Sequence, residues 1–473
     1  MTTIFSTSLA QLHYPSAFKI GQLATIYKDG QRKDIKNYRG VNSVPNIAKV
    51  FDKIIRDQLK LIISPRIKPT QHGFISNRNI VTNLCELTNL IYDAFANNTQ
   101  LDVIYTDVEK AFDHVDKSLE IKKLARFPLS NQMLFWFKSY LTDRKQYVRV
   151  GNARSRLILV SSGVGQGSVN GPFLFVVFFD DSDPLMGEII SLNFADDKKL
   201  ARFIDNTDDA IELQNGLDEF MRWCNDNRLM VNSGKCKVIT FTRKKNPIIF
   251  NYTINGEPIT RVDETMDLGV LVDKGATFRS HYEYVTNRAV STSKFVKRQS
   301  QYFSMDTIKT IYQLLARSIL EFSSPIWSPI HLVHKNRIES VQKQMVLFLL
   351  GDDKRHLTQS YELSPYTERC EQLGLTLLVR RRINAMVMFI HALIIGKYQS
   401  PNLRSRITIN ATTRLTRYTN LIYTRMNDNS PFNVSCKLFN IAAQHIDPTL
   451  THNQFRSALI KLPDNLFSHW IAL

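Results

Sequence analysis

The feature that most constrains this chain is a pair of adjacent carboxylates, Asp196 and Asp197, flanked by apolar residues. A strand-like apolar run at 189–194 precedes the pair and further apolar residues follow it, which predicts a β-hairpin with carboxylates at its tip. A third carboxylate, Asp107, closes the apolar run at 101–106. Ionised carboxylates at the ends of buried strands are costly unless a cation neutralises them. We therefore expect the three carboxylates to converge on bound cations.

Two divalent metal ions would supply the required positive charge. Paired metals about 3.5–4 Å apart activate the attacking hydroxyl and stabilise the leaving oxygen in nucleotidyl transfer, with carboxylates as hard ligands. A pair of aspartates alone is usually a solvated turn, and we expect Asp180 and Asp181 only to cap or end the apolar segment before them. Asp196 and Asp197 differ because strand-like residues lie on both sides. Their order and spacing relative to Asp107 predict a polynucleotide polymerase.

Size and charge are compatible with this hypothesis. The chain has 473 residues, which exceeds one ordinary core and predicts two or three lobes. Lys and Arg number 61 against 43 acidic residues, a net charge of +18. Such an excess is typical of proteins that follow phosphate backbones, although a solvated basic surface would give the same composition.

The cysteine pattern and the hydropathy of the chain indicate where in the cell the protein is expected. The five cysteines are scattered without a CxxC pair, so we expect reduced, packed thiols in an intracellular protein of the nucleus or cytoplasm. No apolar run reaches the roughly 18 residues of a membrane span, and the N-terminus lacks the pattern of a signal peptide. We expect no membrane partner.

Periodicity and turn residues predict the secondary structure. Helices are expected at 44–63, 79–96, 115–124 and 206–229, the last with Thr207 as its cap, and mainly helices from 278 onward. Strands are expected at 101–108, 237–242 and 252–259, with a type I′ turn at Asn255-Gly256, and a hairpin is expected at 147–160. Residues 163–171 predict a glycine-rich loop, and 173–180 a helix or a buried strand.

Seven motifs, in order, resemble the reverse transcriptase region of non-LTR retrotransposons, the LINE-type elements of the jockey-like insect group. The motifs are KDGQRKDIKNYRGVNSVPNIAKVFDKII at 28–55, QHGFISNRNIVTNL at 71–84, TDVEKAFD at 106–113, GVGQGSVNGPFLF at 163–175, FADD at 194–197, RLMVNSGKCKVITF at 228–241 and DLGVLVD at 267–273. The segment from 278 to about 403 still resembles the region that follows the polymerase in these elements. Beyond it we assign no role.

The resemblance implies an α+β right-hand polymerase, followed by a mainly helical C-terminal extension. Its expected parts are fingers at 1–100 with part of 120–165, a palm of antiparallel sheet and helices at 101–275 that carries the catalytic and primer-grip hairpins, a helical thumb at 276–350, and a basic helical region of unknown role at 351–473. The implied reaction is RNA-directed DNA synthesis. The implied partners are an RNA template, a DNA primer or target DNA, and deoxynucleoside triphosphates, with protein partners unknown.

The resemblance also assigns residues. It implies two Mg²⁺ ions, with Mn²⁺ as an alternative, held by Asp107, the Val108 carbonyl, Asp196 and Asp197. Lys235 matches a lysine proposed to protonate the departing pyrophosphate, and Lys237 competes for that role. The residues implied to contact nucleotide or template are Lys28, Arg39, Arg78, Phe112, Gln166 and Gly167, and those of the primer grip are Leu268 and Gly269.

Phe112 implies the substrate class. It matches an aromatic steric gate beneath the sugar, where a ring would clash with a 2′-hydroxyl, so deoxynucleotides are expected. A viral RNA-dependent RNA polymerase would have a polar residue there. A nuclease or a DDE-type transposase would need neither the gate nor the Gln166 loop.

The chain also departs from the family pattern. Gly165 stands where GVPQGS motifs have proline, and Ile75 stands where the family has an arginine. These changes leave open a decayed or domesticated copy that only binds nucleic acid. Relatives usually carry an endonuclease ahead of the polymerase, whereas this chain begins at the fingers, so we expect a truncated element or a fragment.

Overall fold

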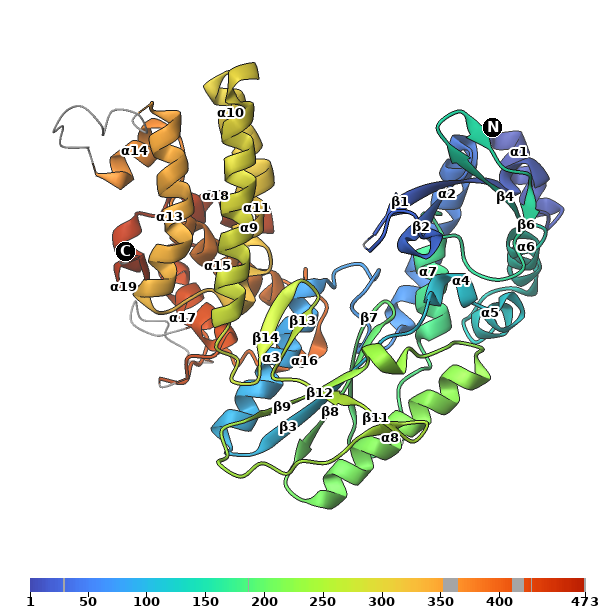
Figure 1. The fold of residues 1–473 in the computed structure, drawn as a ribbon, viewed down its shortest axis with the longest axis horizontal. Coiled ribbons are helices and arrows are strands. Elements are labelled where there is room, and N and C mark those ends of the chain that lie inside the picture. The colour runs from blue at the N-terminus through green and yellow to red at the C-terminus, as the bar shows by residue number, and fades with distance from the viewer. Residues whose placement is uncertain (29, 186, 352–364, 411–420, 427, 472–473) are drawn as a thin grey trace. The chain divides into compact units, whose positions relative to one another are not determined.

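The computed structural model describes residues 1–28, 30–185, 187–351, 365–410, 421–426 and 428–471. It divides into two compact units (Figure 1). Unit 1 comprises Met1–Asn79, Thr99–Thr240 and Lys244–Val262, and unit 2 comprises Ile80–Asn98, Phe241–Arg243 and Asp263–Leu473. Both helices and antiparallel sheet are present, so the predicted α+β class is confirmed. The borders of fingers, palm and thumb stay predictions, and part of the predicted 351–473 region lies outside the described residues.

A five-stranded sheet organises unit 1, in the order β12-β9-β3-β8-β7. Its strands are β3 (Gln100–Thr106), β7 (Ile190–Phe194), β8 (Asp197–Ile204), β9 (Lys237–Thr242) and β12 (Thr260–Arg261). Strand β3 runs antiparallel to β8 from Gln100 opposite Ile204 to Thr106 opposite Lys198. Because Asp107 directly follows Thr106, this register brings it to the end of the sheet where β7 turns into β8.

A second sheet lies in the N-terminal half of unit 1. Its strands are β1 (Ile20–Tyr27), β2 (Tyr38–Ser43), β4 (Lys145–Val150), β5 (Ala153–Arg154) and β6 (Ile158–Leu159). Strand β1 pairs antiparallel with β2 and parallel with β4. Strands β4 and β5 form the predicted hairpin around residues 151–152.

The helices of unit 1 are α1 (Thr2–Ala10), α2 (Asn46–Ile63), α4 (Ala111–His114), α5 (Lys117–Leu124), α6 (Asn131–Leu141), α7 (Gly171–Phe179) and α8 (Thr207–Asp226). Periodicity predicted α2, α5 and α8, whereas α1, α4 and α6 were not predicted. One detail was wrong: α8 is capped by Asn206, not by Thr207. The Asn206 side chain accepts a hydrogen bond from Asp209 N, and the Asp209 side chain bonds back to the Asn206 backbone, which forms a complete capping box.

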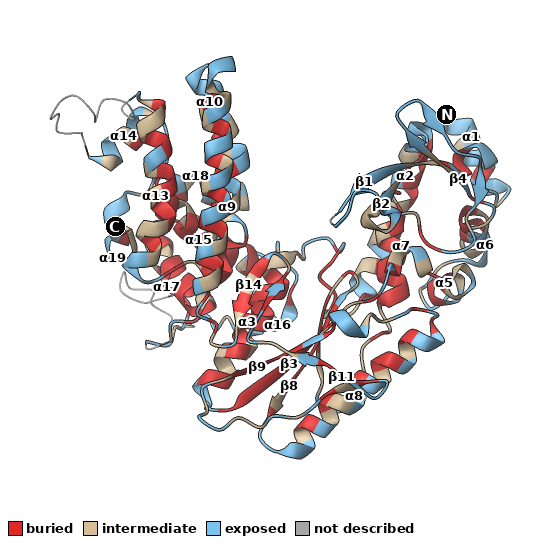
Figure 2. Cartoon of the chain, in the orientation of Figure 1, coloured by how far each residue is buried: buried red, intermediate tan, exposed pale blue. Residues whose placement is uncertain are grey.

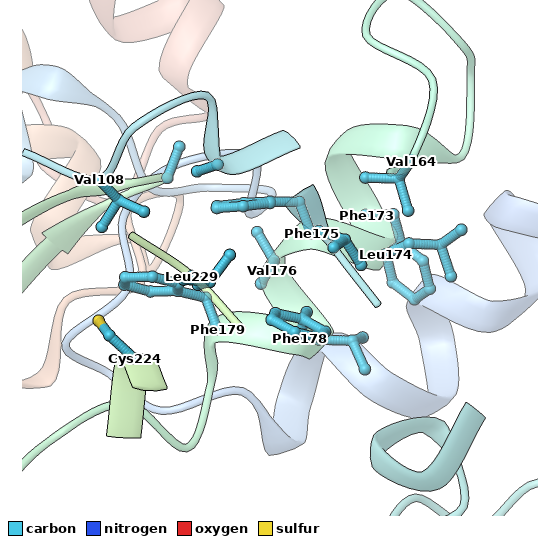
Figure 3. Close-up of a cluster of buried hydrophobic side chains, with 14 of the residues drawn as sticks. Val108, Val164, Phe173, Leu174, Phe175, Val176, Phe178, Phe179, Cys224 and Leu229 are labelled. Atoms are coloured by element: carbon cyan, nitrogen blue, oxygen red, sulfur yellow. The ribbon is translucent and has the colours of Figure 1, made fainter. Parts of the chain in front are cut away.

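Helix α7 forms the centre of the core of unit 1. The segment that predicted either a helix or a buried strand is this helix, and its side chains from Phe173 to Phe179 are all buried. Figure 3 shows them together with Val108, Val164 and Cys224. Burying one such aromatic ring contributes about 1.5–3 kcal/mol. The helix therefore gives the loop before it and the end of β3 a rigid base.

Unit 2 is mainly helical, as predicted from residue 278 onward. Its elements are α3 (Ile80–Ala96), β13 (Glu264–Asp267), β14 (Val270–Asp273), α9 (Arg279–Arg298), α10 (Met305–Tyr312), α11 (Ser318–Glu321), α12 (Ser324–Trp327), α13 (Leu332–Leu349), α14 (Tyr366–Gln372), α15 (Leu378–Ile394), α16 (Pro401–Ser405), α17 (Pro431–Ala443), α18 (His452–Lys461) and α19 (Ser468–Ile471). Buried residues line the facing sides of α9, α13, α15 and α17 (Figure 2).

The five cysteines are buried free thiols, as the scattered spacing predicted. Within the described part of the chain, no helix combines the length and the apolar character that crossing a bilayer requires.

Candidate active site

The turn between β7 and β8 carries the central carboxylate. Phe194 pairs with Asp197, which leaves Ala195 and Asp196 as the turn, and the predicted hairpin is confirmed. Ala195 has a φ of 57°, a left-handed conformation that costs a non-glycine residue about 1–2 kcal/mol. Such strain persists only where the surroundings hold it in place.

Gln71 holds this turn. Its side chain is almost fully buried, with 1% exposed. Its Nε2 donates to the Ala195 carbonyl at 3.3 Å, while its Oε1 accepts from Ala195 N at 2.9 Å and from Gly73 N at 2.8 Å. One amide group thus bonds both main-chain groups of the strained residue. No local sequence signal indicates this role of Gln71, although the QHGF motif begins with it.

The segment around Gln71 extends the edge of the sheet. His72 N donates to the Asn193 carbonyl at 2.8 Å, and Asn193 N donates to the Thr70 carbonyl at 2.9 Å. A Cβ at Gly73 would lie 2.3 Å from Ala195 N, which is backbone and cannot move aside. The glycine of the motif is therefore required by the close approach of two main chains.

A buried ion pair joins Lys198 of β8 to Asp183, which lies in the segment between α7 and β7. Lys198 Nζ, which is fully buried, contacts Asp183 Oδ1 at 2.6 Å, Ser182 Oγ at 3.2 Å and Asn193 Oδ1 at 3.2 Å. Thr70 Oγ1 donates to the other oxygen of Asp183 at 2.8 Å. Burial alone would raise the pKa of Asp183, but Lys198 and these hydrogen bonds outweigh it and hold the pKa at about 2. Sequence reasoning also missed this network, since a lysine within a strand gives no signal of its partner.

Asp196 and Asp107 influence each other electrostatically. Burial raises the pKa of the Asp196 carboxyl above its usual range, the negative charge of Asp107 raises it further, and Arg39 acts in the opposite direction. The charge of Asp107 therefore adds to the negative potential at Asp196, which a divalent cation would relieve. This donor set fits a hard cation. Asp197 begins β8 and is exposed.

The described residues do not form a complete metal cluster. No group of three or more His, Cys, Asp or Glu side chains within them is arranged so that it could hold a metal ion. The register of the strands brings Asp107, after β3, and Asp196, in the β7–β8 turn, to the same end of the sheet.

Lys235 is brought to this locus by pairing of the main chain. Val108 bridges to Val231, and Asn232 N donates to the Asp107 carbonyl at 2.8 Å. The short helix that follows residue 232 then places Lys235 Nζ 3.7 Å from Asp107 Oδ2. Because 59% of the Lys235 side chain is exposed, this ion pair contributes little to stability and leaves the ammonium accessible.

Phe112 of α4 packs against α7. Its ring stacks on Phe175 with centroids 4.3 Å apart and receives the edge of Phe74 at 6.0 Å. Its carbonyl accepts from Val164 N at 2.9 Å, and a Cβ at Gly163 would lie 2.9 Å from the same oxygen. The structure therefore fixes the position of the ring that the resemblance assigns as a steric gate.

The predicted loop at 163–171 packs on β2. Asn42 N donates to the Gln166 carbonyl at 2.7 Å. Gly167 has a φ of 95°, and a Cβ there would lie 2.8 Å from Val41 Cγ1, so glycine is required for two reasons. Gly165 is not in the left-handed region, and its nearest neighbour is the flexible Asn42 side chain at 3.2 Å.

The predicted basic residues have different surroundings. Arg39 lies on β2 opposite Ile26 of β1, exposed, and its charge reaches Asp196. Lys28 is exposed just beyond β1, and its N–H donates to the Asn37 carbonyl at 2.8 Å. Arg78 donates from Nη1 to the Lys68 carbonyl at 2.7 Å and to the Gln71 carbonyl at 2.8 Å, so it braces the segment that holds Gln71.

Leu268 and Gly269 form the turn of a separate hairpin, β13–β14, in unit 2. Their φ angles are 45° and 86°, as in a type I′ turn. A Cβ at Gly269 would lie 2.9 Å from a carbon of the Phe322 ring. The turn is as the sequence predicts, and its role in gripping a primer stays a prediction.

A sheet that presents paired acidic residues at the end of β3 and at a β-turn defines a palm-type polymerase fold. The family model for reverse transcriptase (RNA-dependent DNA polymerase) matches residues 26–278, and the chain belongs to this family. The resemblance read from the seven motifs is thereby confirmed.

Among curated relatives, the chain is 26% identical over 368 residues to an RNA-directed DNA polymerase from mobile element jockey of Drosophila funebris. It is also 26% identical over 367 residues to a probable RNA-directed DNA polymerase from transposon X-element of Drosophila melanogaster. Each match covers 74% of this chain and 40% of the relative. The chain thus spans less than half the length of these relatives. Among solved structures, apo telomerase from Candida Tropicalis is similar with a TM-score of 0.42. The sequence identity is 12%, and the match covers 94% of this chain and 69% of that one.

Proposed function

We propose that the chain is an RNA-directed DNA polymerase of a non-LTR retrotransposon, which joins a deoxynucleoside triphosphate to the 3′-hydroxyl of a primer. The observation that carries the proposal is the placement of Asp196, on a turn held by Gln71, within electrostatic reach of Asp107. Family membership over residues 26–278 supports the reaction class.

The acidic residues would hold the metal. Asp107, Asp196 and Asp197, with the Val108 carbonyl, would bind two Mg²⁺ ions, or Mn²⁺ in their place. When bound, such ions activate the attacking hydroxyl and stabilise the leaving oxygen. The negative charge of Asp107, which disfavours ionisation of Asp196, supports this assignment.

The chain's own residues would orient and neutralise the substrate. Arg39 and Lys28 would bind the triphosphate, and Arg39 already offsets the charge of Asp196. Lys235 Nζ, which lies 3.7 Å from Asp107 and is accessible, would donate the proton to the departing pyrophosphate. Lys237, at the start of β9, is the competing donor.

Phe112 would exclude a 2′-hydroxyl, and its contacts with the rings of Phe175 and Phe74 support the position of its ring. Gln166 and Gly167 would lie against the nascent base pair. Arg78, through its side chain, and the turn at Leu268 and Gly269, as a primer grip, complete the assigned contacts.

The partners belong to the same proposal. They are an RNA template, a DNA primer or target DNA, and deoxynucleoside triphosphates, handled by fingers, palm and thumb with the borders given above. An intracellular location in nucleus or cytoplasm agrees with five free thiols, which reducing compartments maintain.

Primer extension on an RNA template tests the proposal. The purified chain with Mg²⁺ should incorporate deoxynucleotides according to the template, and Asp196→Asn should abolish incorporation. The matched control is Asp226→Asn at the exposed end of α8, which changes the same charge and should leave the rate unchanged. Binding of primer and template without incorporation by the wild-type chain would instead identify a decayed copy, and the proposal would fail.

A further inference from the structure

A cavity of about 690 Å³ lies within unit 2, and part of its lining comes from the region beyond residue 403, to which the sequence assigned no role. Helices α3 and α17 and the segments at 405–408, 423–425 and 428–430 contribute to its walls. Its volume is within the range of about 300–1,000 Å³ that is usual for ligand pockets. The lining residues used below are Tyr92, Asp93, Arg243, Arg406, Tyr423 and Arg425.

Some charged side chains of this cavity have an ion-pair partner and others do not. Asp93 is neutralised by Arg406, whose Nη1 and Nη2 contact its two oxygens at 3.2 and 2.5 Å. Asp428 accepts from Ser430 N at 2.7 Å. Arg243 and Arg425 are exposed, and neither forms an ion pair with another residue that the structure describes. The cavity therefore offers two available guanidinium groups to an anion.

Aromatic faces accompany these cations. The Arg243 guanidinium lies over the Phe95 ring, 4.5 Å from its centroid, and this cation–π contact holds it at the wall of the cavity. Tyr92 meets the edge of Phe95 at 5.8 Å and lines the same wall. The Tyr423 side chain is 62% exposed at the rim. A planar guanidinium and two phenol rings are surfaces on which a base can stack.

The rim is held in place by its own hydrogen bonds. Asn433 donates to the carbonyls of Arg425 and Asp428 at 2.8 and 2.7 Å and accepts from Arg425 N at 3.0 Å. Tyr423 N donates to the Thr408 carbonyl at 2.9 Å. Tyr423 and Arg425 therefore have fixed main-chain positions, so less conformational entropy is lost when a ligand binds.

We propose that this cavity binds one nucleotide of a single-stranded nucleic acid, with Arg243 and Arg425 on the phosphates and Tyr92 and Tyr423 on the base. Backbone-directed arginines combined with aromatic stacking are the chemistry by which proteins hold single strands without reading their sequence. The cavity lies wholly within unit 2, so this site is separate from the carboxylates of unit 1 and goes beyond the proposed polymerase function.

Binding is tested in the full chain carrying Asp196→Asn, so that the outcome does not depend on catalysis. Fluorescence anisotropy would measure the affinity for labelled single-stranded RNA and DNA ten-mers of one sequence and for the corresponding duplex. Arg243→Ala combined with Arg425→Ala should weaken single-strand binding by about tenfold or more and lower the slope of affinity against salt by about 2. Tyr423→Ala should weaken it by about tenfold without changing the salt slope.

The matched control is Arg298→Ala combined with Arg456→Ala, two exposed arginines of unit 2 outside the cavity, which removes the same charge. Loss with RNA alone or with DNA alone supports the site and identifies its strand. Unchanged affinity for both strands overturns it, as does a loss that the control pair or the duplex shares equally. Thermal unfolding of each variant confirms that it is folded. Primer extension by wild type can fail while this binding persists, which separates the two proposals.

Discussion

Two hairpins of unit 1 are held by a glutamine in the same way, but they differ in what they carry. Gln71 bonds the N–H and the carbonyl of Ala195 in the β7–β8 turn. Gln214 of α8 bonds the N–H and the carbonyl of Thr253, at 2.8 and 2.9 Å, in β10 (Thr253–Ile254), which pairs with β11 (Glu257–Pro258).

The turns themselves explain the difference. The β10–β11 turn is Asn255-Gly256, with φ angles of 53° and 84°, and these residue types favour that conformation locally. The β7–β8 turn is Ala195-Asp196, in which Ala195 has a strained left-handed φ and Asp196 is the carboxylate that we propose as a metal ligand. This turn has no locally favourable sequence and depends on the hydrogen bonds from Gln71, whereas the Asn255-Gly256 turn is favoured by its own residues.

The largest expected effect on stability comes from removing the charge of Asp183, the partner of the buried Lys198. Asp183→Asn should lower the free energy of unfolding by about 3–5 kcal/mol, because Lys198 would remain buried without its counter-charge. Denaturant unfolding measures this loss. Lys198→Met added to Asp183→Asn should recover much of it, and a double variant as unstable as the single one would contradict the argument.

The same pair predicts a pH dependence. The pKa of Asp183 is held at about 2, below its ordinary value, so its contribution is complete above about pH 4 and is lost as pH falls toward 2. Unfolding measured across about pH 2 to 5 should show this slope in wild type and lack it in the double variant.

Gly73→Ala should act on the catalytic turn directly. Its Cβ would lie 2.3 Å from Ala195 N, so the two main chains must separate, at a cost of about 1–3 kcal/mol. Primer extension should fall by about 100-fold because Asp196 moves with the turn. Gly40→Ala is the control, since its nearest neighbour lies at an ordinary 3.5 Å.

The glutamines allow a matched test. Gln71→Met and Gln214→Met each remove the bonds to one main-chain residue and should each destabilise the chain by about 1–3 kcal/mol. Only Gln71→Met should also lower the rate of incorporation, with primer–template affinity unchanged. Equal loss of activity in both variants would show that stability, not the position of Asp196, is what the clamp provides.

The smallest effect is expected at the locally encoded turn. Gly256→Ala places a side chain at a φ of 84° but meets no atom within 4 Å, so it should cost about 1 kcal/mol and leave the incorporation rate unchanged. Urea unfolding together with primer extension would check both statements. A drop in the rate would mean that this hairpin also supports the active site.

The same contrast explains what the sequence could predict. Periodicity and turn residues predicted α2, α5, α8, the β7–β8 hairpin and the Asn255-Gly256 turn, because these signals are local. They misplaced the cap of α8 by one residue, since Thr207 and Asn206 can both cap.

The support of the site was not predictable in this way. Gln71 and Ala195 are 124 positions apart, and Lys198 and Asp183 are joined only through the packing of β8. No spacing rule connects such pairs. The motifs indicated which carboxylates to examine, and the structure showed what holds Asp196 in place.

The register of β3 against β8 also limits which insertions and deletions the gene for this chain can tolerate. Thr106 lies opposite Lys198, and Asp107 follows it at the end of the strand. Side chains alternate between faces along a strand, and nearly every residue of β3 is buried. One extra codon within β3 would therefore turn either Asp107 or the buried residues before it to the opposite face. The codon number of this strand is thus constrained twice, by the packing of the sheet and by the direction of Asp107.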